Sequence, residues 1–167
     1  MEQGNLVVFV EVIFRVVLGL RFLSSGLSNV RRWPHATQTA AIVFPRASYF
    51  FGLVATALMV LGGAGVALGF QTPVAAAMLI VFLLPTFRIH YHWLQTEPAE
   101  VRAVGEAIAS EEARSEFRLI GQHAIHSHET GWQNNLVLLA GCLYFSVRGS
   151  VAFGLDNLAK SWVVWLF

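Results

Sequence analysis

Two ionisable residues lie four positions apart in an otherwise apolar run near the amino terminus. Glu11 and Arg15 belong to the stretch 5–28, which is long enough for one helical bilayer crossing of about 20 residues. Each charge would cost about 2.5 to 3.5 kcal/mol at the bilayer centre, so both side chains need partners inside the protein. The spacing places them on one helix face, which makes an ion pair available. This predicts either a polar pocket for a quinone head group or for protons, or a structural pair that fixes helix rotation.

Histidines offer a second kind of chemistry, because imidazole is the commonest ligand of transition metals. The chain has six of them, at His35, His90, His92, His123, His126 and His128. On a helix, His90 and His92 point about 200° apart, so they cannot hold one ion together. The geometrically reasonable cluster is His123 and His126 with one of the other two. It predicts a metal or haem site, with interfacial packing or hydrogen bonding to a quinone as the alternatives.

A third polar feature closes the third apolar run. Arg88 and His92 share a helix face just after Pro85, which we expect to kink the helix. Together they could present hydrogen-bond donors to a quinone carbonyl or an anionic lipid. The candidate contacts of a quinone bound between the first and third helices are therefore Glu11, Arg15, Arg88 and His92.

The composition indicates what surrounds these residues. Hydrophobic residues make up 56% of the 167 positions and charged residues 13%, whereas a soluble domain carries about 25% charge. Positions 47–87 are 41 consecutive uncharged residues, which is room for two crossings of about 20 residues each. Gly69 ends the first and Pro73 starts the second, so we expect an antiparallel hairpin.

Adding the first and last apolar runs gives an all-α fold, a four-helix transmembrane bundle. A barrel is excluded because alternating ten-residue strands are absent. The chain is expected to be one membrane domain, 1–167, with crossings at about 5–28, 48–69, 73–94 and 132–150.

The connection 95–131 is expected to be an extramembrane amphipathic helical insertion that begins near Thr96 and Pro98. Apolar residues such as Val101, Val104 and Ile108 recur there at three- and four-residue steps, as on a helix that lies on a surface. The segment is either a packed, solvated cap or a surface that docks a partner.

Charge sets the expected orientation. Arg148 and Lys160 stand on the side of the termini, against six arginines in the first and third connections, Arg31, Arg32, Arg46, Arg102, Arg114 and Arg118. The positive-inside rule then places those connections in the cytoplasm and the termini outside. The residues expected to anchor the carboxyl-terminal tail at the interface are Trp162, Trp165 and Phe167. A formal net charge of +1 argues against a nucleic-acid partner.

The sequence resembles the DoxX/DoxD-like membrane proteins. The run 15–29 is similar to the family's opening Arg, Gly, Phe, Gly pattern, and 62–69 to its Gly-rich second helix. His90 resembles the histidine that closes the third helix, and 134–156 resembles the last helix with its closing Leu-Asp. Residues 95–125 look like an insertion.

One departure from the family bears on the first helix. Members often carry a glutamate in the second helix, whereas residues 47–70 hold no carboxylate. Glu11 could then supply the missing partner of Arg15.

The resemblance implies a small inner-membrane protein associated with a quinone-linked redox system, such as a subunit of thiosulfate:quinone oxidoreductase or of a terminal quinol oxidase. Its partners would be the lipid bilayer and other membrane or redox subunits. The alternatives are a non-catalytic accessory subunit that docks a larger membrane complex, and a histidine-ligated metal or haem protein.

Overall fold

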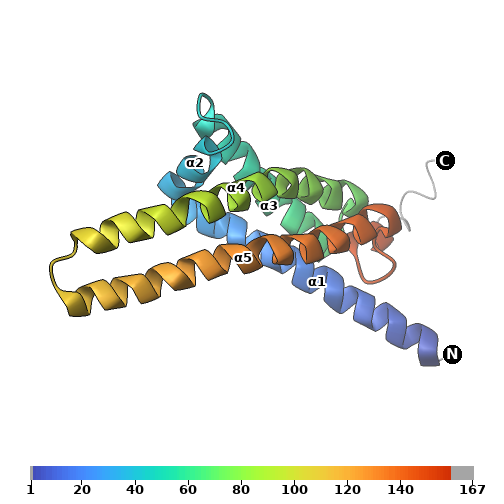
Figure 1. Cartoon of the computed structure of the whole chain (residues 1–167). Coiled ribbons are helices and arrows are strands. Elements are labelled where there is room, and N and C mark those ends of the chain that lie inside the picture. The colour runs from blue at the N-terminus through green and yellow to red at the C-terminus, as the bar shows by residue number, and fades with distance from the viewer. Residues whose placement is uncertain (1, 159–167) are drawn as a thin grey trace. The chain divides into compact units, whose positions relative to one another are not determined.

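The computed structural model describes residues 2–158, and every regular element in that range is a helix (Figure 1). The prediction of an all-α chain is therefore confirmed. The elements are α1 (Glu2–Arg31), α2 (Trp33–Ala41), α3 (Ser48–Leu68), α4 (Thr72–Ala107) and α5 (Glu111–Arg148). The expectations for Lys160, Trp162, Trp165 and Phe167 concern residues outside the described range.

Within residues 2–158, two helices are long and apolar enough to cross a membrane by length and composition. They are α3, with a mean hydropathy of 2.1, and α4, with 1.8. Both come from the uncharged stretch in which the sequence predicted two crossings. The other two predicted crossings, 5–28 and 132–150, fall within α1 and at the end of α5.

The turn between α3 and α4 has the predicted chemistry. Gly69 ends α3 in the left-handed conformation, with φ of 65°, which glycine adopts without strain. The amide of Phe70 donates to the carbonyl of Gly65 at 2.9 Å. Pro73 lies in the first turn of α4, where its missing N–H costs the helix nothing. This confirms the short turn of the helical hairpin.

The contacts divide the chain into two compact units. Unit 1 comprises the residues up to Leu83 together with those from Leu138 onward, and unit 2 comprises Leu84–Val137. Unit 2 therefore consists of the later part of α4, the earlier part of α5 and their connection.

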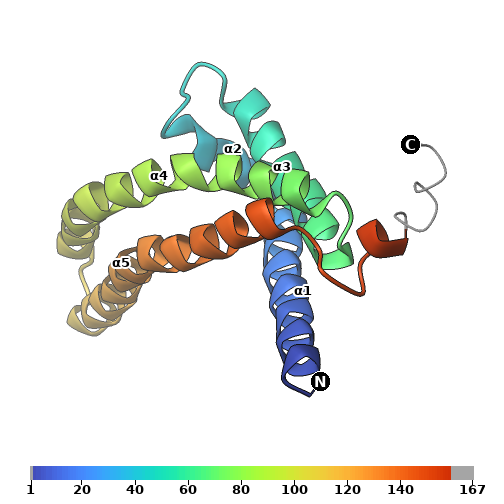
Figure 2. The same ribbon diagram turned by 90° about the vertical axis from the view of Figure 1, so that its right-hand side faces the viewer.

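The core of unit 1 is apolar and closely packed. Its buried members are Leu18, Phe22, Val66, Ala75, Ala76, Leu79, Leu83, Cys142 and Phe145. Helices α1 and α3 lie against each other (Figure 2). A Cβ on Gly63 would lie 2.6 Å from the amide nitrogen of Leu23 and 2.8 Å from the carbonyl oxygen of Gly19. The small residues Gly19 and Gly63 thus allow the two backbones to touch.

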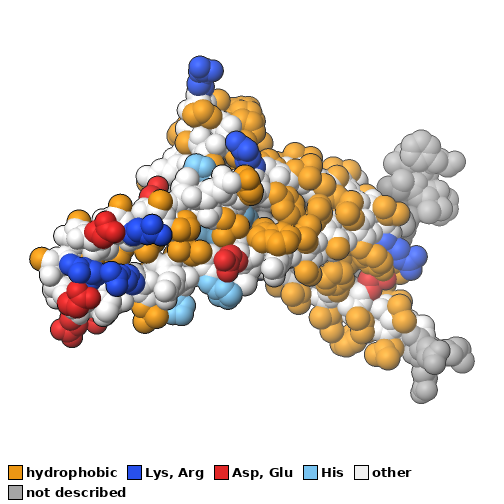
Figure 3. Space-filling model, viewed as in Figure 1, with side chains coloured by type: hydrophobic (Ala, Val, Ile, Leu, Met, Phe, Trp, Pro, Cys, Tyr) orange, Lys and Arg blue, Asp and Glu red, His pale blue; other side chains and the backbone are white. Residues whose placement is uncertain are grey.

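Unit 2 is a hairpin of two long helical arms that lie side by side in Figures 1 and 2. The arms are joined at residues 108–110. A Cβ on Gly121 would lie 2.9 Å from a methyl group of Val101, so the arms are in close contact there. On the face shown in Figure 3, acidic and basic side chains gather at the connected ends of the arms.

Residues 95–131 are helical, as predicted, but they do not form a separate helix. Helix α4 continues through Thr96 and Pro98 to Ala107, so the predicted helix start at those two residues is wrong. Pro98 is exposed, and a proline inside a helix leaves one carbonyl without its N–H partner. On an exposed surface water can satisfy that carbonyl, which is why the arm tolerates the proline.

Candidate functional site

Arg15 is buried in unit 1, with 3% of its surface exposed. Its Nη1 donates a hydrogen bond to the hydroxyl of Ser150 and another to the carbonyl of Ala152, the latter at 3.1 Å. Its Nη2 donates to the carbonyl of Phe153 at 2.9 Å. All three acceptors belong to the loop that follows α5, so this loop holds the Nη end of the guanidinium, whereas Nε of Arg15 is buried with no hydrogen-bond partner in the described chain.

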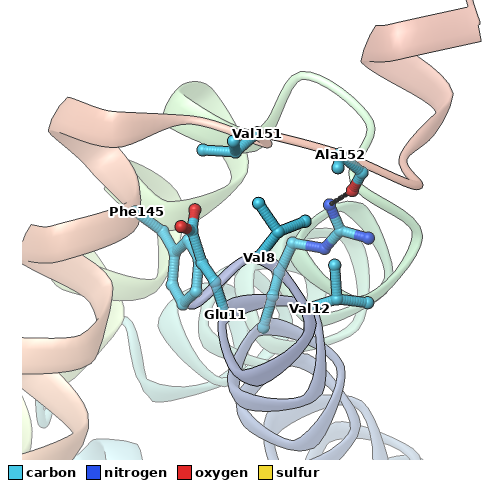
Figure 4. A pocket seen from close by; sticks show the side chains of 7 residues that line it. Val8, Glu11, Val12, Phe145, Val151 and Ala152 are labelled. Carbon is cyan, nitrogen blue, oxygen red and sulfur yellow. Dashed lines mark hydrogen bonds between the residues drawn. The ribbon is translucent and has the colours of Figure 1, made fainter. Parts of the chain in front are cut away.

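The ion pair that helical spacing makes available to Glu11 and Arg15 does not form. No nitrogen of Arg15 lies within 4.0 Å of the Glu11 carboxylate. In Figure 4 the Glu11 carboxylate lies beside Phe145, and the dashed hydrogen bond reaches Ala152. Helical spacing permits the pair, but the long guanidinium side chain reaches loop carbonyls that themselves need donors.

Asp156 ties the same loop to the turn between α3 and α4. Its carboxylate accepts hydrogen bonds from the amides of Gln71, at 2.6 Å, and Thr72, at 3.0 Å. The hydroxyl of Thr72 donates to it at 2.9 Å, and the amide of Asp156 donates to the carbonyl of Gly69 at 2.7 Å. A carboxylate at the first amides of a helix satisfies unpaired N–H groups and the helix dipole. Asp156, the aspartate of the Leu-Asp pair that resembles the family motif, therefore caps the start of α4 from a segment distant in the sequence.

Glu11 is left with an unsatisfied oxygen. The residue is 8% exposed, and its Oε1 is buried with no hydrogen-bond partner in the described chain. On one side the carboxyl lies in a tight gap with no room for a water molecule, lined by Val8, Val12, Arg15, Phe145, Val151 and Ala152 (Figure 4). It also lines an open groove of about 460 Å³ with Leu6, Val7, Val10, Phe14 and Tyr144. The Glu11 carboxyl is thus the single carboxyl group among the apolar and aromatic side chains that line this groove.

Unit 2 has its own polar cluster, between the two arms. Nε2 of His128 lies 3.1 Å from Oε1 of Glu97, and each side chain is 20% exposed. The ring of Trp93 lies 4.3 Å from that of His128, and His90 lies 5.6 Å from it, between ring centroids. Sequence reasoning missed this cluster, because Glu97 and His128 become neighbours only once the chain reverses at residues 108–110.

The His90 ring packs on the opposite arm. A Cβ on Gly131 would lie 3.0 Å from Nδ1 of His90, and that nitrogen is buried with no hydrogen-bond partner in the described chain. Asn135 donates to the hydroxyl of Thr86 at 2.9 Å. The arms therefore meet through polar as well as apolar side chains.

The histidines predicted to form a metal site all lie in unit 2, but they do not converge on one point. His90 and His92 both lie on α4, His92 and His123 are exposed, and His126 lies 3.3 Å from Glu129. Among residues 2–158, no three or more His, Cys, Asp or Glu side chains converge as metal ligands would. The metal or haem site stays a prediction without a ligand set.

The four predicted quinone contacts fall in different units. Glu11 and Arg15 lie in unit 1, whereas Arg88 and His92 lie in unit 2, where both are exposed. Only Glu11 combines burial, an unsatisfied polar atom and an adjoining groove.

The DoxX family model matches residues 10–93. No curated protein and no solved structure matches the chain. The matched range includes Arg15, the glycine contact between α1 and α3, the Gly69 turn and His90, and it covers half of the sequence. By this match, which agrees with the motifs of its first three apolar runs, the chain belongs to the DoxX family.

Proposed function

We propose that this protein is the membrane subunit of a quinone-linked redox system and that it binds the quinone in the groove beside Glu11. The observation that carries the proposal is a buried carboxyl with an unpartnered oxygen on an apolar groove of about 460 Å³. Small-molecule sites are mostly apolar, with a few polar groups, and measure about 300 to 1,000 Å³. The groove fits that description.

The proposal includes a membrane arrangement. We place four crossings within α1, α3, α4 and α5, in one membrane domain of an inner membrane, with the first and third connections in the cytoplasm. Support comes from the family, from the two apolar helices α3 and α4, and from the arginines of those connections. Since α4 and α5 have 36 and 38 residues and a crossing needs about 20, their joined ends would extend beyond the hydrocarbon.

The groove suits a lipid-soluble ligand that arrives from the bilayer. Five of its six lining residues are apolar or aromatic, and those of α1 face outward from unit 1, with Leu6 at 63% and Val10 at 56% exposed. A quinone with an apolar tail could enter sideways without crossing water. When bound, a quinone accepts two electrons and two protons to become a quinol, and a partner redox subunit would supply the electrons.

Glu11 would hold the head group and exchange its proton. A protonated carboxyl donates a hydrogen bond to a carbonyl oxygen, and an ionised one accepts a bond from a hydroxyl. Phe14 and Tyr144, whose ring centroids lie 6.5 Å apart, would flank the ring. Arg15 would not contact the quinone. Its role is structural, because its bonds to residues 150–153 hold the end of α5 against α1.

A titration with a quinone analogue tests the site. We expect saturable binding to the purified chain and a loss of at least about tenfold in affinity in Glu11→Leu, on the scale of one lost hydrogen bond to a buried polar group. Glu106→Gln, on the exposed surface of an arm, is the matched control and should bind normally. Unsaturable binding, or equal affinity in Glu11→Leu, would overturn the proposal.

Labelling with a membrane-impermeant thiol reagent tests the orientation. Cysteines introduced at His35 and His126 should react from the same, cytoplasmic side, and the native Cys142 is buried and should stay silent. Labelling of the two positions from opposite sides would refute the four-crossing arrangement.

A second candidate function is that of a docking subunit, which the arms of unit 2 favour. Leu119 and Ile120 are 57% and 66% exposed on α5, although they stand among charged residues. A photo-reactive residue at Ile120 should crosslink one defined subunit in native membranes, and a control at Glu106 should crosslink it less. The absence of any product at Ile120 would count against docking.

A further inference from the structure

The corner between α1 and α3 is basic and free of acidic residues. Arg31 and Arg32 stand at the end of α1, His35 lies in α2, and Arg46 lies two residues before α3. All four are exposed, and the sequence has no Asp or Glu from position 12 to 96. Figure 3 shows a basic side chain at the tip of this corner. Nothing of opposite charge within that stretch of chain neutralises them.

Helix α2 is held at this corner by packing on α3. A Cβ on Gly52 would lie 3.4 Å from the carbonyl oxygen of Ala36, and Ala36 is buried. The ring of Trp33 meets that of Tyr49 edge to face, with centroids 5.5 Å apart. The corner is therefore a built surface with fixed aromatic side chains rather than a loose loop.

Its place in the chain puts the corner at a membrane surface. Helix α3 is one of the two helices that could cross a bilayer, and it begins at Ser48, directly after the corner. Tryptophan and tyrosine favour the headgroup level of a bilayer. Arginines beside them would stand among lipid phosphates, which a guanidinium binds with two parallel hydrogen bonds.

We propose that the α2 corner, defined by Arg31, Arg32, His35 and Arg46, is a binding site for the phosphate headgroup of anionic phospholipids. Charge complementarity selects this occupant over a zwitterionic lipid, whose headgroup carries a compensating cation. The arginines attract the lipid phosphate. Trp33 and Tyr49 set the depth at which the corner lies in the headgroup region. Arg32 is partly pre-oriented, because its Nη2 donates to the Ser28 hydroxyl at 2.6 Å.

Native mass spectrometry of the full chain in detergent provides the test. Phosphatidylglycerol and phosphatidylcholine with the same acyl chains are titrated in parallel, and the expected result is tighter binding of phosphatidylglycerol. In Arg31→Gln/Arg46→Gln this preference should fall about 25-fold, from about fivefold for each basic residue near a surface. The matched control, Arg102→Gln/Arg118→Gln, removes two exposed arginines from the arms and should keep the preference.

Three results would overturn the site. They are equal binding of the two lipids by the wild type, no change in the double variant, and an equal loss in the control, which would show that only net charge matters. Added salt should weaken the preference of the wild type for phosphatidylglycerol, because it screens the charges. This measurement tests the site even if the double variant does not fold. If inorganic phosphate displaced phosphatidylglycerol more than chloride at equal ionic strength, the corner would instead recognise free phosphate. None of these measurements involves Glu11, so they are independent of the quinone proposal.

Discussion

The two units treat buried charge in different ways. In unit 1, Arg15 is bonded to a hydroxyl and two backbone carbonyls of a loop 135 or more positions away. In unit 2, Glu97 is bonded to the side chain of His128 across two helical arms, and both remain 20% exposed. The first arrangement fixes a guanidinium with backbone groups that cannot rotate away, whereas the second joins two side chains that water can still reach.

This difference separates structural from chemical roles within unit 1. Because the loop accepts the hydrogen bonds of both Nη atoms of Arg15, the neighbouring Glu11 carboxyl is left with an oxygen that has no hydrogen-bond partner in the described chain. The sequence alone left open whether the two groups contact each other. The comparison leads to four predictions about the free energy of unfolding, in order of decreasing effect.

The largest effect is expected for Arg15→Leu. The change removes the donor to buried Ser150 and to the partly buried carbonyls of Ala152 and Phe153, and breaking such a network costs about 3 to 5 kcal/mol. Thermal unfolding in detergent measures it. Arg21→Leu, at an exposed arginine of the same helix, should change the stability by less than about 0.5 kcal/mol. Equal losses in the two variants would refute a structural role for Arg15.

The second effect compares two close approaches of glycine. Gly63→Ala forces a methyl group against backbone atoms of α1 and should destabilise unit 1 by about 2 to 3 kcal/mol through overpacking. In Gly131→Ala the new methyl group meets the His90 ring, which can turn aside. The higher helix propensity of alanine stabilises the helix by about 1 kcal/mol and offsets part of the loss from this contact. Denaturant titration of both variants should therefore show a large loss in the first and less than about 1 kcal/mol in the second.

The third effect concerns the helix caps. Asp156→Ala removes the acceptor for the first amides of α4 and should cost about 1 to 2 kcal/mol. In unit 2, Ser110 accepts from the amide of Ala113 at 3.4 Å, a long bond, so Ser110→Ala should cost only about 0.5 kcal/mol. Calorimetry of the two variants compares them, and a larger loss for Ser110 would reverse the ranking of the two units.

The smallest effect is expected for the ion pair of the arms. Glu97→Gln keeps the shape but removes the charge beside His128, and a pair with partial access to water contributes about 0.5 to 1 kcal/mol. The exposed pair of Glu111 and Arg114, at 2.8 Å, serves as control, since Glu111→Gln should cost less than about 0.5 kcal/mol. Chemical unfolding followed by Trp93 fluorescence measures both. A loss above about 2 kcal/mol for Glu97 would show that the pair is as tightly constrained as Arg15.

The sequence predicted features that have local causes. The Gly69 turn followed because glycine and proline act on the backbone within a few residues. The all-helical class followed from the long apolar runs.

Features with distant partners were not predictable in the same way. Loop carbonyls such as those of Ala152 and Phe153 have no residue-type pattern, because every residue has a carbonyl, so the partners of Arg15 could not be named. Pro98 suggested a helix start, but an exposed helix face tolerates the missing N–H. Glu97 and His128 required knowing where the chain reverses.

The bonds of Arg15 also set an order in which the protein can be completed. The arginine lies within α1, 135 or more positions before its acceptors Ser150, Ala152 and Phe153. A chain synthesised only as far as α4 would hold a guanidinium without these partners. Water or another polar group would have to satisfy that charge until the loop that follows α5 is made.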